Sequence, residues 1–261
     1  MTPEAFDLTG RVALITGAGS ESGIGFAAAR LLAQLGCSIA VCATTDRVRE
    51  RARELAAGGT AATSHIGDLT DEADASRIVA EATAEHGAVD ILVNNAGMVS
   101  IGGGFEQGAL IDMDYATWRG GLARNLDTAF LVTRAALPGM VDRRWGRIVN
   151  VASVTGPQMA MRDEPVYAAA KAAMVGLVRS VTVDYAAVGV TANAVAPGWI
   201  ATGSQTDHER DQGRRTPVGR SATPDEVASA IAWLCTPGAA YVTGQCLVVD
   251  GGNSVSEERS T

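Results

Sequence analysis

The chain has 261 residues, 47% of them hydrophobic and 19% charged, a composition that supports one large buried core and argues against general disorder. There are 21 basic and 29 acidic residues, and the net charge of −8 repels phosphate backbones and anionic lipid, so we expect no nucleic-acid or membrane partner. The N-terminus lacks a basic and apolar leader, and no 18-residue apolar run occurs, which predicts a cytoplasmic location. No linker divides the chain, so residues 1–261 are predicted to form a single domain, with 254–261 as a loose tail.

Short apolar runs alternate with longer segments of helical period along the chain, which is the pattern of repeated βαβ units. In chain order, we expect strands at 12–16, 38–42, 91–94, 148–152, 191–196 and 246–249. The segments between them predict helices at 23–35, 45–57, 72–86, 117–139, 166–187 and 224–234. These elements indicate an α/β protein with a single-domain Rossmann fold, in which a doubly wound parallel sheet carries helices on both faces.

A glycine-rich turn follows the first predicted strand and contains Gly17, Gly19, Gly23 and Gly25. Glycines let the backbone approach a pyrophosphate closely, and the following helix supplies free N–H groups and about half a positive charge. The turn therefore predicts a dinucleotide site, with a tight turn that binds nothing as the alternative. No Gly-Lys-Ser/Thr sequence follows it, which excludes a nucleoside-triphosphate loop.

The end of the second strand indicates which dinucleotide binds. Ala43 stands where a carboxylate would accept the ribose 2′-hydroxyl of NAD, and the hydroxyls of Thr44 and Thr45 follow it. Arg47 falls in the first turn of the next helix, where a cation opposes the helix dipole unless an anion lies nearby. We therefore expect NADP(H) as the preferred cofactor and leave NAD(H) open, because Asp46 is either a ligand or a helix N-cap.

Tyr167 and Lys171 lie one turn apart in a predicted helix, so their side chains share a face. Lowering a tyrosine pKa from ~10 to ~7 needs roughly 4 kcal/mol, which one ammonium ~4 Å away supplies at an effective dielectric of ~20. The pair is common on helices, so it needs further support. Ser153 ends an apolar strand fourteen residues earlier, Asn95 follows another strand, and Asn125 lies in the helix between.

With these motifs in this order, the chain resembles the short-chain dehydrogenase/reductase family over 10–252. Further matches are Asp68-Leu69 after a third strand, the segment 197–202 and the ending 243–252. The resemblance implies that Tyr167 is the general acid/base, Ser153 binds the substrate oxygen, Lys171 depresses the tyrosine pKa and binds the nicotinamide ribose, and Asn125 organises a water relay.

The resemblance also implies a set of cofactor contacts on the loops that follow the strands. Asp68 would meet the adenine, Asn95 the adenosine-side ribose, and Ile200 and Thr202 the carboxamide and phosphates. The full expected set is Gly17, Ser20, Ser22, Gly23, Ile24, Gly25, Thr44, Arg47, Asp68, Leu69, Asn95, Ala96, Gly97, Tyr167, Lys171, Pro197, Gly198, Ile200 and Thr202. We expect no metal, four inert buried cysteines, and a homotetramer built through the helices of Asn125 and Tyr167 and the C-terminal strand.

Three segments depart from the family pattern. Five residues separate Gly17 from Gly23 where the family usually has three, and Ser22 stands where NADP-binding members often carry a basic residue. Residues 98–116 are longer and richer in glycine than usual, and the segment after Thr202 is short and polar. We expect substrate specificity to reside in these last two segments.

The predicted substrate is a small apolar ketone or secondary alcohol. Its hydrophobic lining is expected from Val99, Val154, Met159, Met161 and Trp199.

The first alternative is a 3-oxoacyl-(acyl-carrier-protein) reductase, with Arg143, Arg144 and Arg147 as a docking patch, although Val188 stands where those reductases commonly carry arginine. An NADP(H)-sensing binding protein would lack the tyrosine, and a sugar-nucleotide epimerase or dehydratase would need a longer chain. No Gly-x-Ser-x-Gly sequence supports a hydrolase.

Overall fold

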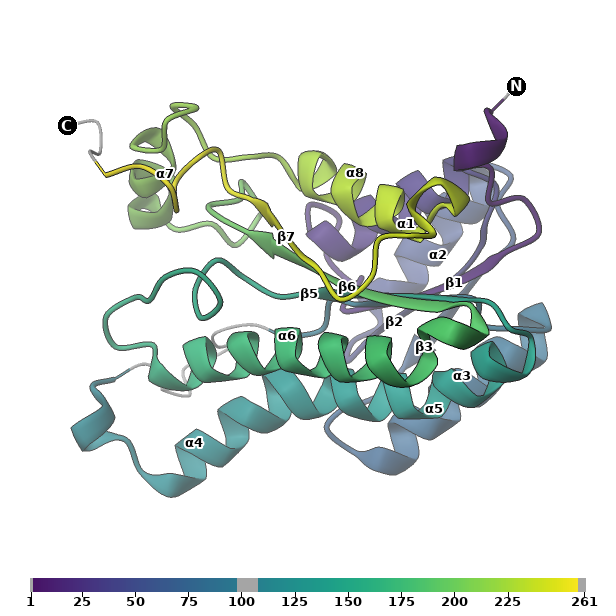
Figure 1. Ribbon diagram of the computed structural model, residues 1–261, viewed down its shortest axis with the longest axis horizontal. Coiled ribbons are helices and arrows are strands. Elements are labelled where there is room, and N and C mark those ends of the chain that lie inside the picture. The colour runs from purple at the N-terminus through teal and green to yellow at the C-terminus, as the bar shows by residue number, and fades with distance from the viewer. Residues whose placement is uncertain (1, 98–107, 258–261) are drawn as a thin grey trace.

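The computed structural model describes residues 2–97 and 108–257, and it confirms the predicted α/β fold. Seven parallel strands form one sheet in the order β3-β2-β1-β4-β5-β6-β7 (Figure 1). The strands are β1 (Val12–Thr16), β2 (Ser38–Ala43), β3 (Ala62–Ile66), β4 (Ile91–Asn94), β5 (Gly146–Val151), β6 (Val190–Pro197) and β7 (Cys246–Val249). The strand order reverses between β1 and β4, and this reversal opens a crevice at the carboxyl ends of the strands.

Helices cover both faces of the sheet (Figure 1). One face carries α1 (Ile24–Gln34), α2 (Arg47–Ala57) and α8 (Pro224–Cys235). The other face carries α3 (Glu72–His86), α5 (Thr128–Asp142) and α6 (Pro165–Tyr185). The central strands β1, β4, β5 and β6 are buried along their whole length, which is why they appear in the sequence as continuous apolar runs.

Strand β3 is the element that the hydropathy pattern did not indicate. It lies at the edge of the sheet, pairs only with β2, and is polar at Thr63, Ser64 and His65. An edge strand has one neighbour and is half-exposed, so its sequence carries a weak apolar signal.

The helix expected at 117–139 is divided. It consists of α4 (Tyr115–Leu122), the π-helical turn η3 (Ala123–Asp127) and α5. A further helix, α7 (Asp207–Arg214), was not predicted. It buries only Gly213 and is therefore polar all round, and it begins at a capping box between Thr206 and Glu209.

Helix α6 with its continuation to Val188 has the length and hydropathy of a membrane span, but it packs along the sheet beside β6 as a core helix (Figure 1). Among the cysteines, Cys37, Cys42 and Cys235 are buried, and burial raises the thiol pKa of Cys37 and Cys42 to about 12. Cys246 is only partly buried, contrary to expectation. Within residues 2–97 and 108–257, no three His, Cys, Asp or Glu side chains converge to hold a metal.

Candidate active site

The glycine-rich turn after β1, residues 17–23, is called the phosphate loop below. It is held in place by Thr16, the last residue of β1. Its hydroxyl oxygen accepts hydrogen bonds from the backbone N–H groups of Asn95 and Ala96, both at 2.9 Å. The Asn95 side-chain amide donates to the carbonyl oxygens of Thr16 and Gly17 at 3.0 and 3.1 Å. The Asn95 amide thus joins the loop after β1 to the loop after β4. Sequence reasoning missed Thr16, although a hydroxyl at a strand end before glycine was the available signal.

A cavity of about 660 Å³ lies at the strand reversal. Twelve expected cofactor residues line it: Gly17, Ser20, Gly23, Ile24, Thr44, Arg47, Asp68, Leu69, Asn95, Ala96, Gly97 and Thr202. It is also lined by residues not in the expected set: Gly19, Ala43, Thr45, Gly67, Thr70, Gly120, Ala123, Arg124, Thr128 and Ser204. Ser22, Gly25, Pro197, Gly198 and Ile200 do not line it. The cavity size is typical of a site for a small ligand or cofactor.

The start of α1 suits a pyrophosphate. Gly23 is its N-cap residue and has no side chain to occupy the free N–H groups, and no acidic residue falls in the first turn. These donors and the positive end of the helix dipole face the cavity beside the Ser20 hydroxyl. The residues present therefore fit a dinucleotide phosphate at this position.

The loop between β2 and α2 contributes hydroxyls and the Arg47 guanidinium to the cavity lining. Arg47 lines it, and the Arg47 Nε donates to the Thr45 hydroxyl at 3.4 Å. Asp46 occupies the N-cap position of α2 but caps nothing, because its carboxylate pairs with Arg49 at 2.9 Å. The Asp68 carboxylate accepts from the N–H and hydroxyl of Thr70 at 3.0 and 2.8 Å.

Ser153, Tyr167 and Lys171 come together just beyond β5. The Ser153 hydroxyl oxygen accepts a hydrogen bond from the Thr155 N–H at 3.1 Å, and the Ser153 hydroxyl lies close enough to the Tyr167 phenol to lower its pKa. The Lys171 Nζ lies over the Tyr167 ring, 5.5 Å from its centroid, and donates to the Val151 carbonyl oxygen at 3.0 Å. None of the three lines the 660 Å³ cavity, so they lie outside the part of the crevice that the phosphate loop encloses.

Burial is the main cause of the pKa shifts of Tyr167 and Lys171. It raises the pKa of Tyr167 above its ordinary value, which the hydrogen bond from Ser153 partly offsets, and the nearby Glu164 raises the pKa further. Burial also lowers the pKa of Lys171 to about 8. The ammonium lies over the ring face, and in this state Tyr167 keeps its proton at neutral pH. A protonated phenol at this position can donate to a substrate oxygen.

Asn125 is brought to the same edge by the π-helical turn. It is fully buried, and its side-chain amide donates to the Gly121 carbonyl oxygen at 3.2 Å. A Cβ on Gly97 would lie 2.9 Å from the Asn125 Oδ1, so the loop after β4 packs directly on this residue. Single π-turns in helices commonly mark functional positions.

A buried amide pair behind the site was missed by sequence reasoning. The Asn94 amide donates to the Asn150 Oδ1 and to the Thr133 hydroxyl, both at 2.9 Å, and the Asn150 amide donates to the Met174 carbonyl oxygen at 3.3 Å. These bonds tie β4 and β5 to the helices α5 and α6. The pairing depends on strand register, which opposes Asn94 and Asn150.

The expected apolar lining is only partly enclosed. Val154 is buried, Met159 and Trp199 are partly buried, and Met161 is 40% exposed. Val99 lies outside the described residues. The Asn253 amide contacts the Met159 sulfur at 3.5 Å, so the C-terminal segment reaches this wall.

The arginines considered for carrier docking lie at the opposite edge of the sheet. Arg143 pairs with the buried Asp90 at 3.2 Å, and Arg147 is buried with its guanidinium 4.5 Å from the Trp145 ring centroid. Arg147 is thus unavailable for docking, whereas Arg143 and Arg144 remain exposed, so at most two of the three arginines could contribute to the expected patch.

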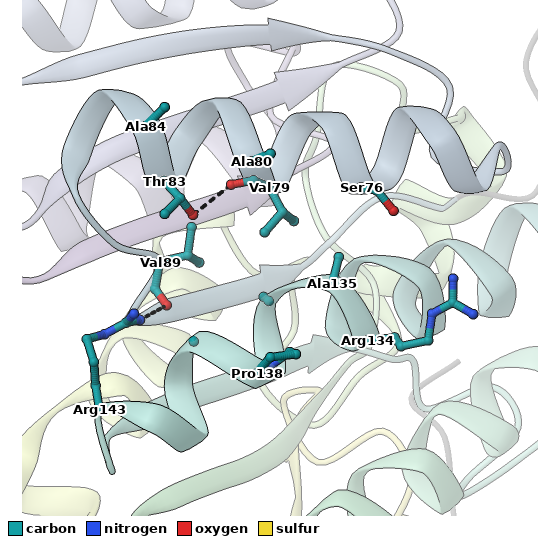
Figure 2. Close-up of a pocket in the computed structure, with 12 residues that line it drawn as sticks. Ser76, Val79, Ala80, Thr83, Ala84, Val89, Arg134, Ala135, Pro138 and Arg143 are labelled. Carbon is teal, nitrogen blue, oxygen red and sulfur yellow. Dashed lines mark hydrogen bonds between the residues drawn. The ribbon is translucent and has the colours of Figure 1, made fainter.

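A second cavity of about 620 Å³ lies between α3 and α5 and is shown in Figure 2. Its walls are mostly alanine and valine, with Arg134 and Arg143 at its edges. It contains none of the expected catalytic or cofactor residues, so the chemistry is assigned to the crevice at the strand reversal.

Known proteins are similar to this chain over nearly its whole length. A family model described as Enoyl-(Acyl carrier protein) reductase matches residues 17–254. A cis-4-hydroxycyclohexanecarboxylate dehydrogenase of Sinomonas cyclohexanicum is 39% identical, covering 93% of this chain and 96% of the relative. A 3-oxoacyl-(acyl-carrier-protein) reductase of Vibrio cholerae is 38% identical, covering 94% and 98%.

Solved structures agree with these relatives. A candidate NAD(P)-dependent gluconate 5-dehydrogenase from Beutenbergia cavernae, with NADP bound at low occupancy, has a TM-score of 0.87 and 38% identity, covering 97% of this chain and 100% of the other. A 7α-hydroxysteroid dehydrogenase in complex with NADH and 7-oxo glycochenodeoxycholic acid has a TM-score of 0.89 and 30% identity, covering 99% and 100%.

Proposed function

Because the chain belongs to the short-chain dehydrogenase/reductase family and is a nicotinamide-dependent oxidoreductase, we propose that it interconverts a ketone and a secondary alcohol with Tyr167 as general acid/base. The observation that carries this proposal is the placement of the Lys171 ammonium over the Tyr167 ring, with the Ser153 hydroxyl close to the phenol, in a fold whose cavity suits a dinucleotide.

The bound nicotinamide supplies or accepts the hydride. In the reductive direction, the Ser153 hydroxyl orients the carbonyl oxygen and the Tyr167 hydroxyl donates a proton to it. Lys171 supplies positive charge beside the phenol as negative charge develops. Asn125, at the π-turn, is assigned to the path by which the tyrosine regains its proton from solvent.

We assign NADP(H) as the preferred cofactor, with NAD(H) as the alternative. Arg47, Thr44 and Thr45 face the adenosine end of the cavity, and Ala43 leaves room where a carboxylate would repel a 2′-phosphate. The exposed Asp46 carboxylate does not line the cavity, and it is paired with Arg49 at 2.9 Å, which reduces its repulsion of a 2′-phosphate.

The proposed substrate is a small apolar carbonyl compound or alcohol, bound near Val154, Met159 and Trp199. A 3-oxoacyl-(acyl-carrier-protein) reductase is the second candidate, favoured by the Vibrio cholerae relative. It is ranked lower because Arg147 is buried and Arg143, although exposed, is paired with Asp90. We also propose a cytoplasmic homotetramer assembled through α5, α6 and the C-terminal strand β7. Phe130, Val183 and Leu247 on these elements are 43%, 85% and 36% exposed.

The test is a panel of ketones and secondary alcohols followed at the nicotinamide absorbance, with Tyr167→Phe as the variant. We expect Tyr167→Phe to lose turnover by a factor on the order of 10² to 10⁴ while binding cofactor normally, because only the proton donor is removed. Tyr185→Phe, at the end of the same helix, is the matched control and should keep its activity. Retained turnover in Tyr167→Phe would contradict the proposed mechanism.

A further inference from the structure

The phosphate loop is longer than usual by two residues, and these residues form the tip of a turn. The Gly23 N–H donates to the Ser20 carbonyl oxygen at 3.2 Å, which places Glu21 and Ser22 at the corners of the turn. Both are exposed, and neither of them lines the cavity. The insertion therefore projects from the loop toward neighbouring elements.

The two residues of the tip reach two different elements. The Glu21 carboxylate lies 3.9 Å from Arg51 of α2, whose guanidinium also pairs with Glu54. The Ser22 hydroxyl oxygen accepts a hydrogen bond from the Gly203 backbone N–H at 3.0 Å, across 181 residues of chain. One side of the turn is thus tied to the body of the protein and the other to the segment after β6.

The segment that Ser22 contacts forms a wall of the dinucleotide cavity. Thr202 and Ser204, on either side of Gly203, line the cavity, and their hydroxyls are 3.1 Å apart. The segment continues into α7, which lies at the molecular surface and buries only Gly213. The same wall is also held by the Gln205 side-chain amide, which donates to the Ser221 hydroxyl at 2.7 Å. The bond between Ser22 and Gly203 is therefore a second tether, and it is the one that joins this wall to the phosphate loop.

We propose that Ser22 is a positioning residue that holds the 202–206 segment closed over the bound dinucleotide and thereby slows cofactor release. This inference rests on the proposed function, because it requires the cavity to be the cofactor site. The dinucleotide would be enclosed between the phosphate loop on one side and Thr202 and Ser204 on the other. Breaking the Ser22 hydrogen bond would free the wall from the phosphate loop while its bond from Gln205 to Ser221 remains, and it would remove no group from the cavity.

The experiment measures release of bound NADPH from the full-length protein by stopped flow, with excess NADP as the displacing ligand. Ser22→Ala should raise the release rate about two- to ten-fold, the effect of one net hydrogen bond, and should leave the association rate unchanged. Ser22→Thr keeps the hydroxyl and should restore slow release. Ser229→Ala removes an exposed serine that bonds a backbone carbonyl on α8, and it serves as the control with wild-type release.

A second variant tests the same contact from the other side. A Cβ on Gly203 would lie 2.5 Å from the Ser22 hydroxyl oxygen, so Gly203→Ala should also raise the release rate. The double variant should release NADPH no faster than Ser22→Ala, because removing the hydroxyl also removes the obstruction. Additive effects of the two substitutions would overturn the proposal.

The outcomes separate this inference from the proposed function. If the wild-type protein binds neither NADPH nor NADH, the proposed function is wrong, and so is the proposed role of Ser22. If the wild type binds cofactor and Ser22→Ala releases it at the wild-type rate, only the proposed role of Ser22 is overturned. If the loss of NADPH affinity in Ser22→Ala comes entirely from a slower association rate, the substitution has distorted the phosphate loop. This result would also overturn the proposed role of Ser22.

Discussion

Lys171 should destabilise the folded protein at neutral pH, because its ammonium is buried with only 3% of the residue exposed. Burial lowers the pKa of Lys171 from 10.5 to about 8, so the folded chain prefers the neutral amine. At 1.36 kcal/mol for each pKa unit, this difference corresponds to about 3 kcal/mol of unfolding free energy. Lys171→Met replaces the amine by an apolar side chain of similar size and removes that cost.

The pH dependence has a definite sign. Below pH 8 the amine is protonated in both states, and the folded protein bears the full cost of the buried charge. Between pH 8 and 10.5 the unfolded chain binds the proton and the folded chain does not, so wild-type stability rises relative to the variant. The difference in unfolding free energy between Lys171→Met and the wild type should therefore fall by roughly 2 to 3 kcal/mol between pH 7 and pH 10.

The assay is urea unfolding of both proteins at pH 7 and pH 10, at equal protein concentration. Losing the hydrogen bond to the Val151 carbonyl offsets the gain by about 1 to 3 kcal/mol, but this offset is the same at both pH values. Lys171 is the single lysine of the chain, so no other lysine contributes to the change. Arg53→Met replaces an exposed cation, so its unfolding free energy should differ from that of the wild type by the same amount at both pH values. A constant difference for Lys171→Met would refute the reasoning.

Three further predictions concern the cofactor, the acid range and the packing at the site. Arg47→Ala should reduce the thermal shift produced by NADP more than that produced by NAD; equal losses would contradict a contact with the 2′-phosphate. The hydrogen bond from Arg220 lowers the pKa of Glu226 to about 2, so its stabilising contribution is complete above pH 4.5 and is lost as the pH falls toward 2. Glu226→Gln should therefore flatten the dependence of stability on pH in this window, as measured by urea unfolding. Gly97→Ala should lower the melting temperature by several degrees, because φ is 134° and the new Cβ would lie 2.9 Å from the Asn125 Oδ1; an unchanged melting temperature would refute it.

Features of the site that depend on neighbours along the chain could be predicted from the sequence. The apolar runs of β1, β4, β5 and β6 predicted their strands because both faces of each strand are buried. The glycine turn predicted the phosphate loop, and the four-residue spacing of Tyr167 and Lys171 placed them on one helix face, since helix geometry fixes which side chains meet.

Features that depend on contacts between distant segments were decided by the tertiary structure. The amide pair of Asn94 and Asn150 exists because β4 lies beside β5 in that register, and local periodicity does not encode which strands are neighbours. The bond between Ser22 and Gly203 likewise joins loops far apart in the chain. The sequence by itself determined the elements, the phosphate loop and the tyrosine–lysine pair, because these follow from local geometry; the structure alone decided how the loops close around the crevice, because that depends on the order in which the strands assemble.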